Sequence, residues 1–565
     1  MKVLVTALLI LIIAGGAWAS GGAQRDTGTP VVDRSNFNAL GTFPLVKQKE
    51  NVTIMIGEGS STFNGETNWM SKFYEEKTNV HTNFVVAPLE QFKERVNLAL
   101  ASSERIDAVI AANSGMTAYT FNEYMRFAEQ GVILPIQDYI ETDTIYIKNN
   151  LKLQEGWREV LTLPNGNIYA FPSLNDCYHC RYYGKMWINM EFMKNLNLRV
   201  PTTLEEFRQM LIAFRDRDAN GNGDPNDEIP MMASYDHFGA RVDTFLVSAF
   251  IYDDGENRLF LDNGKVVAAF MQPEFQDGLR YLNQLYREGL IARDSFTLNR
   301  NERILLNSTK YESIIGAMPN IHHGLGNRES GEPVRWIDYE PIVPLKGPNG
   351  LQVTRYDHYQ KFMITEAAGF IPVTCRNPAL IMRMVDWFQT EEGNIILRYG
   401  EKGVGWDDAD PGATGPDGSP AKIKPLTVPN TNPYYGNLIW GSRFPNYSTY
   451  QFRNLAQAAA DMRAEDGSGL ERFLEQMSRE RYEPYAQKVE NLLPPLYYSG
   501  DNVLEMTSMT TNINTYVEES IAKFVVGDLN IDTGWAAYLA NLRNLGVDRY
   551  LQIIQNTYNA SAFAK

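Results

Sequence analysis

The fold class is decided by the stretch "NVTIMIGEGSSTFNGETNWMSKFYEEKTNVHTNFVVAP", residues 51–88. It contains an apolar run at Val52–Ile56 that predicts a strand, then an amphipathic helical pattern, and then a second strand at Thr82–Val86. The next segments, "QFKERVNLALASS" at 91–103 and "IDAVIAA" at Ile106–Ala112, predict another helix and a third strand. Strands that alternate with helices at this spacing indicate a parallel α/β sheet.

The carboxyl ends of these strands carry polar and small residues. Gly57 and Glu58 follow the first strand, and Asn113 and Ser114 follow the third. Ligands of parallel α/β sheets bind beyond the carboxyl ends of the strands. We therefore expect a binding site at this edge of the sheet.

The bulk composition bounds the classes of function. The chain has 565 residues, of which 44% are hydrophobic and 21% charged, and this length favours two or more lobes. Its formal net charge of -16 disfavours nucleic acid as a partner. Thirty Tyr and nine Trp fit a large core, and they would also suit a cleft that stacks on flat ligand faces.

The first residues have the pattern of an export signal. Lys2 precedes the apolar run "VLVTALLILIIAG", and "AWA" at Ala17–Ala19 offers a cleavage site, so residues 1–19 are expected to be a signal peptide. A membrane anchor is the competing interpretation, but the run is short for a span. No Cys follows directly that could carry a lipid. We expect an exported protein, periplasmic or extracellular, whose residues 20–44 form a flexible tether.

The three cysteines favour a structural role. Cys177 and Cys180 form "CYHC", and Cys375 lies far along the chain. A zinc site would need more ligands than His179 offers nearby. The sequence leaves open whether the first two thiols form a tight disulfide, which an exported protein permits, or stay buried and reduced.

An oxygen-rich loop, "RDRDANGNGDPNDEIP", covers residues 215–230. With either Asp216 or Asp218 as the first ligand position, a glycine falls at position six, where a calcium loop turns sharply. Calcium prefers six to eight oxygen ligands in flexible geometry, which this loop supplies better than the small octahedron of magnesium. The alternative is a solvated Asn/Gly turn. We expect a structural Ca²⁺ site at residues 216–230.

Four longer segments together resemble a known family. They are "MWINMEFMKNLNLRVPTTLEEF", "DANGNGDPNDEIP", "NGKVVAAFMQPEFQDGLRYLNQLYREGLI" and "VDWFQTEEGNIILRYGEKGVGW". The family comprises the extracellular solute-binding proteins (family 1) of bacterial ABC importers, in the branch of the alginate-oligosaccharide-binding and lipoprotein-type sugar-binding proteins. The calcium ligands that the resemblance implies are Asp218, Asn220, Asn222, the Asp224 carbonyl, Asp227 and Glu228. The spacing after Gly223 is one residue longer than the family's.

The resemblance also implies a type II periplasmic-binding-protein fold, in which two α/β lobes, each with a mainly parallel sheet flanked by helices, enclose a ligand cleft. Residues 45–180 with 361–435 would form the first lobe, and 181–360 with 436–565 the second. Because Trp and Tyr rings stack on sugar faces and polar groups pair with hydroxyls, the candidate ligand contacts are Glu58, Trp69, Asp176, Tyr178, Trp336, Arg355, His358, Trp406 and Trp440. Core packing is an equally good interpretation of each Trp. Arg355 would pair with a uronate carboxylate, or belong to a surface ion pair.

These observations predict an exported solute-binding protein. It would capture a carbohydrate, expected to be an oligosaccharide, by hinge closure and deliver it to the permease subunits of an ABC importer. We expect a monomer and no enzymatic activity, since no acid/base pair is recognisable. The alternatives are a secreted glycan-active enzyme that uses paired carboxylates, and a binding protein for a peptide or another non-sugar solute.

Overall fold

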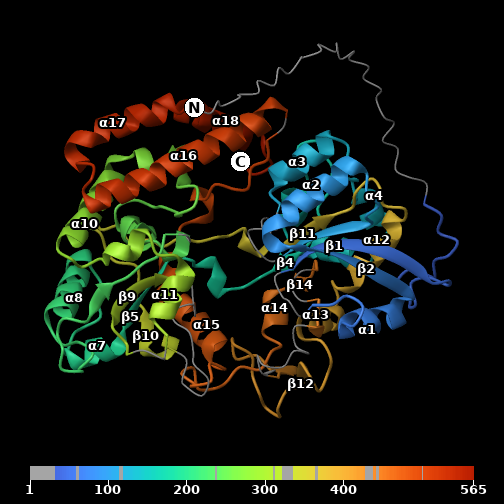
Figure 1. Ribbon diagram of the computed structural model, residues 1–565, viewed down its shortest axis with the longest axis horizontal. Coiled ribbons are helices and arrows are strands. Elements are labelled where there is room, and N and C mark those ends of the chain that lie inside the picture. Colours follow the sequence, from blue (N-terminus) through green and yellow to red (C-terminus); the bar gives the residue numbers. More distant parts are fainter. Residues whose placement is uncertain are drawn as a thin grey trace, which may run out of the picture. The chain divides into compact units, whose positions relative to one another are not determined.

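The first two predicted strands form β1 and β2 of a four-stranded sheet with strand order β11-β3-β1-β2, in which β1 is an inner strand and β2 an edge strand (Figure 1). β1 (Glu50–Glu58) lies parallel to β2 (Val80–Pro88) and to β3 (Ala108–Ala112), as the sequence predicts. The fourth strand, β11 (Ala367–Phe370), returns from far along the chain and pairs antiparallel with β3. The expected α/β class is therefore confirmed, with an antiparallel edge strand added to the parallel core.

The structure is a computed structural model. It describes residues 32–58, 63–112, 119–235, 238–308, 312–320, 335–362, 367–426, 437–440, 444–498 and 500–564. The expected signal peptide lies outside these residues. Within the described part of the chain, no helix has both the length and the apolar character needed to cross a bilayer.

Helices cover the first sheet and enclose an aromatic core. α1 (Trp69–Thr78) begins at Asn68, whose side chain accepts a hydrogen bond from the Ser71 N–H. The remaining helices near this sheet are α2 (Phe92–Ser102), α3 (Phe121–Glu129), α4 (Gln137–Asp143), α5 (Tyr146–Leu153), α6 (Trp157–Leu161), α12 (Pro378–Trp387) and α13 (Glu391–Tyr399). Tyr74 of α1 lies within 5.4 Å of the Trp387 ring, so burial of large rings joins distant parts of the chain.

The folded chain starts inside the segment that was expected to be a tether. Phe37 is buried and pairs in a β-bridge with Val46. The Arg383 guanidinium lies 4.2 Å from the Phe37 ring centroid, and the Gln48 N–H donates to Asn36 Oδ1 at 2.8 Å. Residues 36–44 therefore pack on the fold, because Phe37 buries an apolar ring that a solvated tether would expose.

A second sheet has strand order β10-β5-β9-β6 and is mixed. β5 (Lys185–Asn189) pairs antiparallel with both β9 (Ile315–Asn320) and β10 (Tyr339–Pro341), while β6 (Ile229–Met231) is parallel to β9. The expectation of a mainly parallel sheet fits the first sheet better than this one. β5 and its two neighbours run in opposite directions, which accounts for the antiparallel pairs.

Two helices beside the second sheet have starts that nearby residues determine. α8 (Leu204–Asp216) begins with a capping box between Thr203 and Glu206, and α10 (Pro273–Arg287) has Pro in its first turn. α7 (Met190–Asn195), α9 (Val242–Leu246) and α11 (Arg300–Leu306) complete the layer. Of the C-terminal helices, α16 (Asp501–Val526) and α17 (Ile531–Asn544) pack on α10, and α18 (Val547–Ala560) packs on α16 and α17; all three extend the same core (Figure 1).

Several chain segments connect the part of the fold around the first sheet with the part around the second, called here the first and second lobes. One connection pairs β4 (Leu174–Asn175) with β14 (Tyr447–Ser448) in parallel. The strands and helices not yet named are β7 (Leu259–Asp262), β8 (Lys265–Ala268), β12 (Trp406–Asp408), β13 (Ile423–Pro425), α14 (Tyr450–Arg453) and α15 (Leu470–Arg481). The connection at residues 353–362 returns the chain toward β11.

Candidate functional site

A pocket with a volume of about 500 Å³ lies where segments from both lobes meet. Thr120, Phe121 and Asn122, at the start of α3, supply the wall from the first lobe. The turn at 252–259 and the connection at 355–359 supply most of the opposite wall. Residues 492–498, called here the strap, line it as well, together with Thr510, Tyr550 and Ile554 of the C-terminal helices.

A network of buried charged side chains stabilises the turn at 252–259. Arg258 forms ion pairs with Asp243 and Asp253, and all three side chains are nearly inaccessible to solvent. Arg258 itself has a φ of 56°, which a residue other than Gly rarely adopts. Burial raises the pKa of Asp253. For Asp243 burial is also the largest single effect, but the guanidinium groups of Arg258 and Arg241 and the hydrogen bonds together outweigh it, so the pKa is lowered.

Arg355 lies in the pocket wall, and both of its terminal nitrogens donate hydrogen bonds within the protein. Its Nη1 donates to the Asp254 carbonyl at 2.6 Å, and its Nη2 donates to Glu256 Oε2 at 2.8 Å. Asp357 Oδ2 lies 3.6 Å from the same Nη2, and the guanidinium carbon lies 5.1 Å from the Tyr183 ring centroid. Of the two functions expected for Arg355, the structure shows an ion pair within the protein.

Aromatic rings form much of the remaining surface. Phe121 and Tyr497 stack with their centroids 4.7 Å apart, which joins the first lobe to the strap. His358 meets Tyr359 edge to face at 5.1 Å, and burial lowers its pKa, with Lys361 acting in the same direction. Burial raises the pKa of five of the tyrosines that line the pocket, so their hydroxyls stay neutral. They are Tyr252, Tyr359, Tyr497, Tyr498 and Tyr550.

The strap is fastened to the first lobe by hydrogen bonds. Tyr497 Oη donates to the Val160 carbonyl, and the Tyr498 N–H donates to Asn122 Oδ1 at 3.0 Å. Directly after it, the Gly500 N–H donates to Glu129 Oε1 at 3.1 Å. Because α16 then continues in the second lobe, the strap is an additional link between the lobes.

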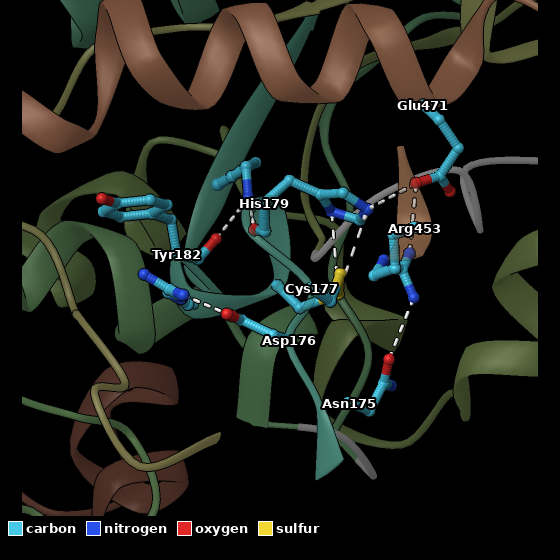
Figure 2. The surroundings of a disulfide bond; sticks show 10 residues. Asn175, Asp176, Cys177, His179, Tyr182, Arg453 and Glu471 are labelled. Atoms are coloured by element: carbon cyan, nitrogen blue, oxygen red, sulfur yellow. Dashed lines mark hydrogen bonds and ion pairs between the residues drawn. A yellow bond between two sulfur atoms is a disulfide. The ribbon is translucent and has the colours of Figure 1, made fainter. Parts of the chain in front are cut away.

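The other candidates from the sequence lie outside this pocket. Asp176, labelled in Figure 2, pairs with Arg181 in the connection that leads to β5. The Tyr178 ring packs 5.8 Å from that of Tyr182. Glu58 is nearly buried at the end of β1. Trp69 stacks on Phe73 at 5.0 Å.

The three later tryptophans make contacts within the protein. Trp336 is 3% exposed, and its ring lies 5.5 Å from that of Phe473. Trp440, at 1% exposure, stacks on Phe444 at 4.6 Å in the first lobe, although the expected boundary places it in the second. The Trp406 indole N–H donates to the Gly400 carbonyl at 3.0 Å. None of the three is among the residues that line the pocket.

Of the ligand contacts expected from the sequence, Arg355 and His358 line the pocket. Most of the aromatic residues that line it were not expected. The tyrosines at 183, 252 and 356 stand in segments without a recognisable motif. A usable signal was "PPLYY" at 494–498, where two prolines keep the chain extended and present two adjacent tyrosines.

Of the two states that the sequence leaves open for Cys177 and Cys180, the structure shows the disulfide. Cys177 and Cys180 form a disulfide, and Cys375 is a buried free thiol. The disulfide removes both thiols as metal ligands beside His179. His179 Nε2 instead lies 3.4 Å from Glu471, which also pairs with Arg453 at 3.2 Å (Figure 2).

The oxygen-rich loop is closed by hydrogen bonds between the expected calcium ligands and the backbone. Asp218 accepts from the N–H groups of Gly221 and Gly223, at 2.8 and 3.0 Å, and both glycines have positive φ. Asn222 Nδ2 donates to Asp227 Oδ2 at 2.8 Å, and Asn220 Nδ2 donates to Asp227 Oδ1 at 3.3 Å.

The acidic end of the loop has an unsatisfied oxygen. Glu228 Oε1 accepts from the backbone of Ala219 and Asn220, whereas its Oε2 is buried and has no hydrogen-bond partner among the described residues. Asp224 Oδ1 accepts from the Asn226 N–H at 3.1 Å. Glu312, which lies 3.2 Å from Asn222 Nδ2, is a nearby carboxylate that the sequence did not indicate.

Comparison with known proteins supports the expected relationship. No family model matches the chain. A curated relative, the fructooligosaccharide ABC transporter substrate-binding protein FusA of Streptococcus pneumoniae, is 23% identical over 548 residues, 92% of this chain and 91% of the relative.

Solved structures show the same fold. FusA in complex with kestose has a TM-score of 0.73 at 22% identity, covering 91% of this chain and all of the other. A FusA "EF-hand mutant" gives 0.70 at 21% identity over the same shares. A human-milk-oligosaccharide-binding (HMO-binding) solute-binding protein from Bifidobacterium longum infantis gives 0.74 at 18%, with 90% and 99% covered. Alginate-binding protein AlgQ2 without calcium gives 0.63 at 19%, with 91% and 99% covered. The type II binding-protein fold is thereby confirmed.

Proposed function

Because the chain is a homologue of ABC transporter substrate-binding proteins and has their fold, we propose that it is an exported solute-binding protein that captures an oligosaccharide and delivers it to the permease subunits of an ABC importer. The observation that carries this proposal is the pocket between α3 and the second lobe. Its walls combine tyrosine rings, which can stack on pyranose or furanose faces, with polar groups that can pair with hydroxyls.

The position of the pocket suits capture by closure. Its lining comes from both lobes, so a ligand that contacts both walls favours the arrangement in which they are close. The connections at β4/β14, at 353–362 and at the strap are the segments that would bend. A ligand shifts this equilibrium by as much as its affinities for the two arrangements differ.

Binding is favoured over catalysis by the state of the acids in the pocket. Asp254 Oδ1 accepts hydrogen bonds from the N–H groups of Glu256 and Arg258, at 2.8 and 2.6 Å. This carboxylate therefore stabilises the turn. Glu256 and Asp357 face Arg355. A glycosidase would need two carboxyl groups presented to the substrate as acid and base. The named relatives are binding proteins as well.

The loop at 216–230 is proposed to hold a structural Ca²⁺ ion. Asp218, Asp227 and Glu228 supply carboxylates, and Asn220 and Asn222 supply amide oxygens within the same hydrogen-bonded ring. The buried Glu228 Oε2 without a partner fits a cation ligand, since an unpaired buried carboxylate oxygen is costly. A bound cation would neutralise the carboxylates and fix the joint between α8 and β6.

Thermal unfolding against an oligosaccharide panel, with and without EDTA, tests both parts. Any ligand that binds the folded state raises the melting temperature by mass action. We expect a rise with at least one oligosaccharide, and a fall on removal of calcium that is absent in Glu228→Gln. Asp216→Asn is the matched control, since Asp216 pairs with Arg215 and should leave the EDTA effect intact. Cleavage of a sugar would favour the glycan-active enzyme. A rise in melting temperature only with peptides would favour the binding protein for a non-sugar solute.

A further inference from the structure

We propose that the pocket selects uncharged oligosaccharides and discriminates against those that carry uronate or other carboxylate groups. This inference rests on the proposed function and adds the chemical class of the ligand. It follows from how the charges of the pocket are arranged and from how completely its guanidinium is engaged.

The fixed charges on the pocket wall are mainly negative. Among the described residues that line it, Asp254, Glu256 and Asp357 are acids and Arg355 is the guanidinium. Burial raises the pKa of Asp254 to about 6, against the opposing effect of Arg355, so this acid is still mostly ionised at neutral pH. A carboxylate on the ligand would therefore approach an excess of negative charge in a partly desolvated site.

Arg355 has little capacity for a ligand carboxylate. A bidentate pair would need two adjacent N–H groups of the guanidinium. Its Nη1 already donates to the Asp254 carbonyl and its Nη2 to Glu256, with Asp357 close to the same nitrogen, while its face lies over the Tyr183 ring. Recognition of a uronate would first have to break this ion pair.

Basic residues near the pocket do not offset the negative charge of its wall. His358 lines the pocket, but burial lowers its pKa, so it is neutral at pH 7. Arg181 is paired with Asp176 in the adjacent connection. Lys361 is half-buried and is not among the residues that line the pocket.

The polar groups that remain for a ligand are neutral. Tyr252, Tyr359, Tyr498 and Tyr550 line the pocket, and burial keeps their hydroxyls protonated. A phenolic hydroxyl can donate to or accept from a sugar hydroxyl without a change of charge, and its ring offers an apolar face. This combination suits the hydroxyl-covered surface of a neutral sugar.

Calorimetric titration with matched ligand pairs tests the inference. The probes are trigalacturonate and its methyl ester, and an aldotetraouronic acid and xylotriose, together with kestose and other neutral trisaccharides. We expect the tightest ligand to be neutral, and the neutral member of any pair that binds to bind at least 30-fold more tightly, which corresponds to about 2 kcal/mol. The ratio should fall as salt is raised, since screening weakens the repulsion.

The variant Glu256→Gln removes one lining charge and weakens the hold on Arg355. We expect it to bring the affinities for acid and neutral members closer by fivefold or more. Asp262→Asn, at an exposed position on β7, makes the same change of net charge away from the pocket and should leave the ratio unaltered. A uronate that binds as tightly as its neutral partner, or an unchanged ratio in Glu256→Gln, would overturn the inference and leave the proposed function standing. If no oligosaccharide binds, the proposed function itself fails.

Discussion

Replacement of Arg258 by methionine would leave two buried carboxylates under the pocket turn without the guanidinium that joins them. Arg258, Asp243 and Asp253 are 3%, 2% and 0% exposed. Removing one partner from a buried ion pair costs about 3–5 kcal/mol, because the remaining charge is uncompensated. Arg241, which lies 3.6 Å from Asp243, still supports that acid, so Asp253 carries most of the loss.

The expected shift in melting temperature follows from the size of the fold. Unfolding entropy is about 2.1 cal/mol/K per residue, or about 1 kcal/mol/K for roughly 500 residues. A loss of 3–5 kcal/mol therefore lowers the melting temperature by about 3–5 °C, which scanning calorimetry resolves. The exposed Arg280, paired with Asp277 and Asp532, supplies the control Arg280→Met, for which we expect less than about 1 kcal/mol.

The deficit should also depend on pH with a definite sign. Without Arg258, burial holds the folded-state pKa of Asp253 above the unfolded value of about 3.9, so its ionisation opposes folding. The penalty is complete above the folded pKa and disappears below the unfolded one. The difference from the wild type should shrink between pH 7 and pH 4.5, and Asp253→Asn should partly rescue the variant. Equal stability at pH 7, or a deficit that grows in acid, would refute the reasoning.

Three further outcomes are expected. Burial lowers the pKa of Lys185 to about 7, well below its unfolded value, so wild-type stability should rise by about 2–3 kcal/mol from pH 7 to pH 9, and Lys185→Met should flatten that rise in urea titrations. Reduction of Cys177–Cys180, or replacement of both by Ser, should cost about 2 kcal/mol or less in the same assay, because the disulfide closes a very short loop. Asn122→Ala removes the acceptor of the Tyr498 N–H; amide exchange in the strap should become faster and sugar affinity several-fold weaker, and unchanged exchange would contradict the proposed link.

What the sequence predicted well depends on neighbours along the chain. The apolar run of β1 is determined within a few residues, and the structure confirms the strand. The capping box at Thr203 and the proline at the start of α10 are equally local features. The closing of the loop at 216–230 is equally local, since Asp218 accepts from amides three and five positions ahead. These features need no knowledge of distant contacts.

What it could not predict depends on contacts between residues far apart in sequence. Glu256 engages Arg355 across 99 positions, so the sequence alone could not tell a ligand-binding guanidinium from a paired one. The sequence could not assign Trp336 and Trp440 either, because a tryptophan that stacks on a sugar and one in a core can have the same neighbours in sequence. In the structure both rings pack on phenylalanines. The strap reaches α3 from nearly 380 positions away, as the bond from Tyr498 to Asn122 shows.

The origin of β11 sets an order of assembly for the two sheets. Every strand of the second sheet comes from one continuous stretch between Lys185 and Pro341. The first sheet needs its strand from Ala367–Phe370, which closes a loop of more than 250 residues onto β3. Loop closure over such a length slows pairing. As the chain refolds, the second sheet should therefore protect its amides first, while the unpaired edge of β3 stays open to wrong partners until β11 arrives.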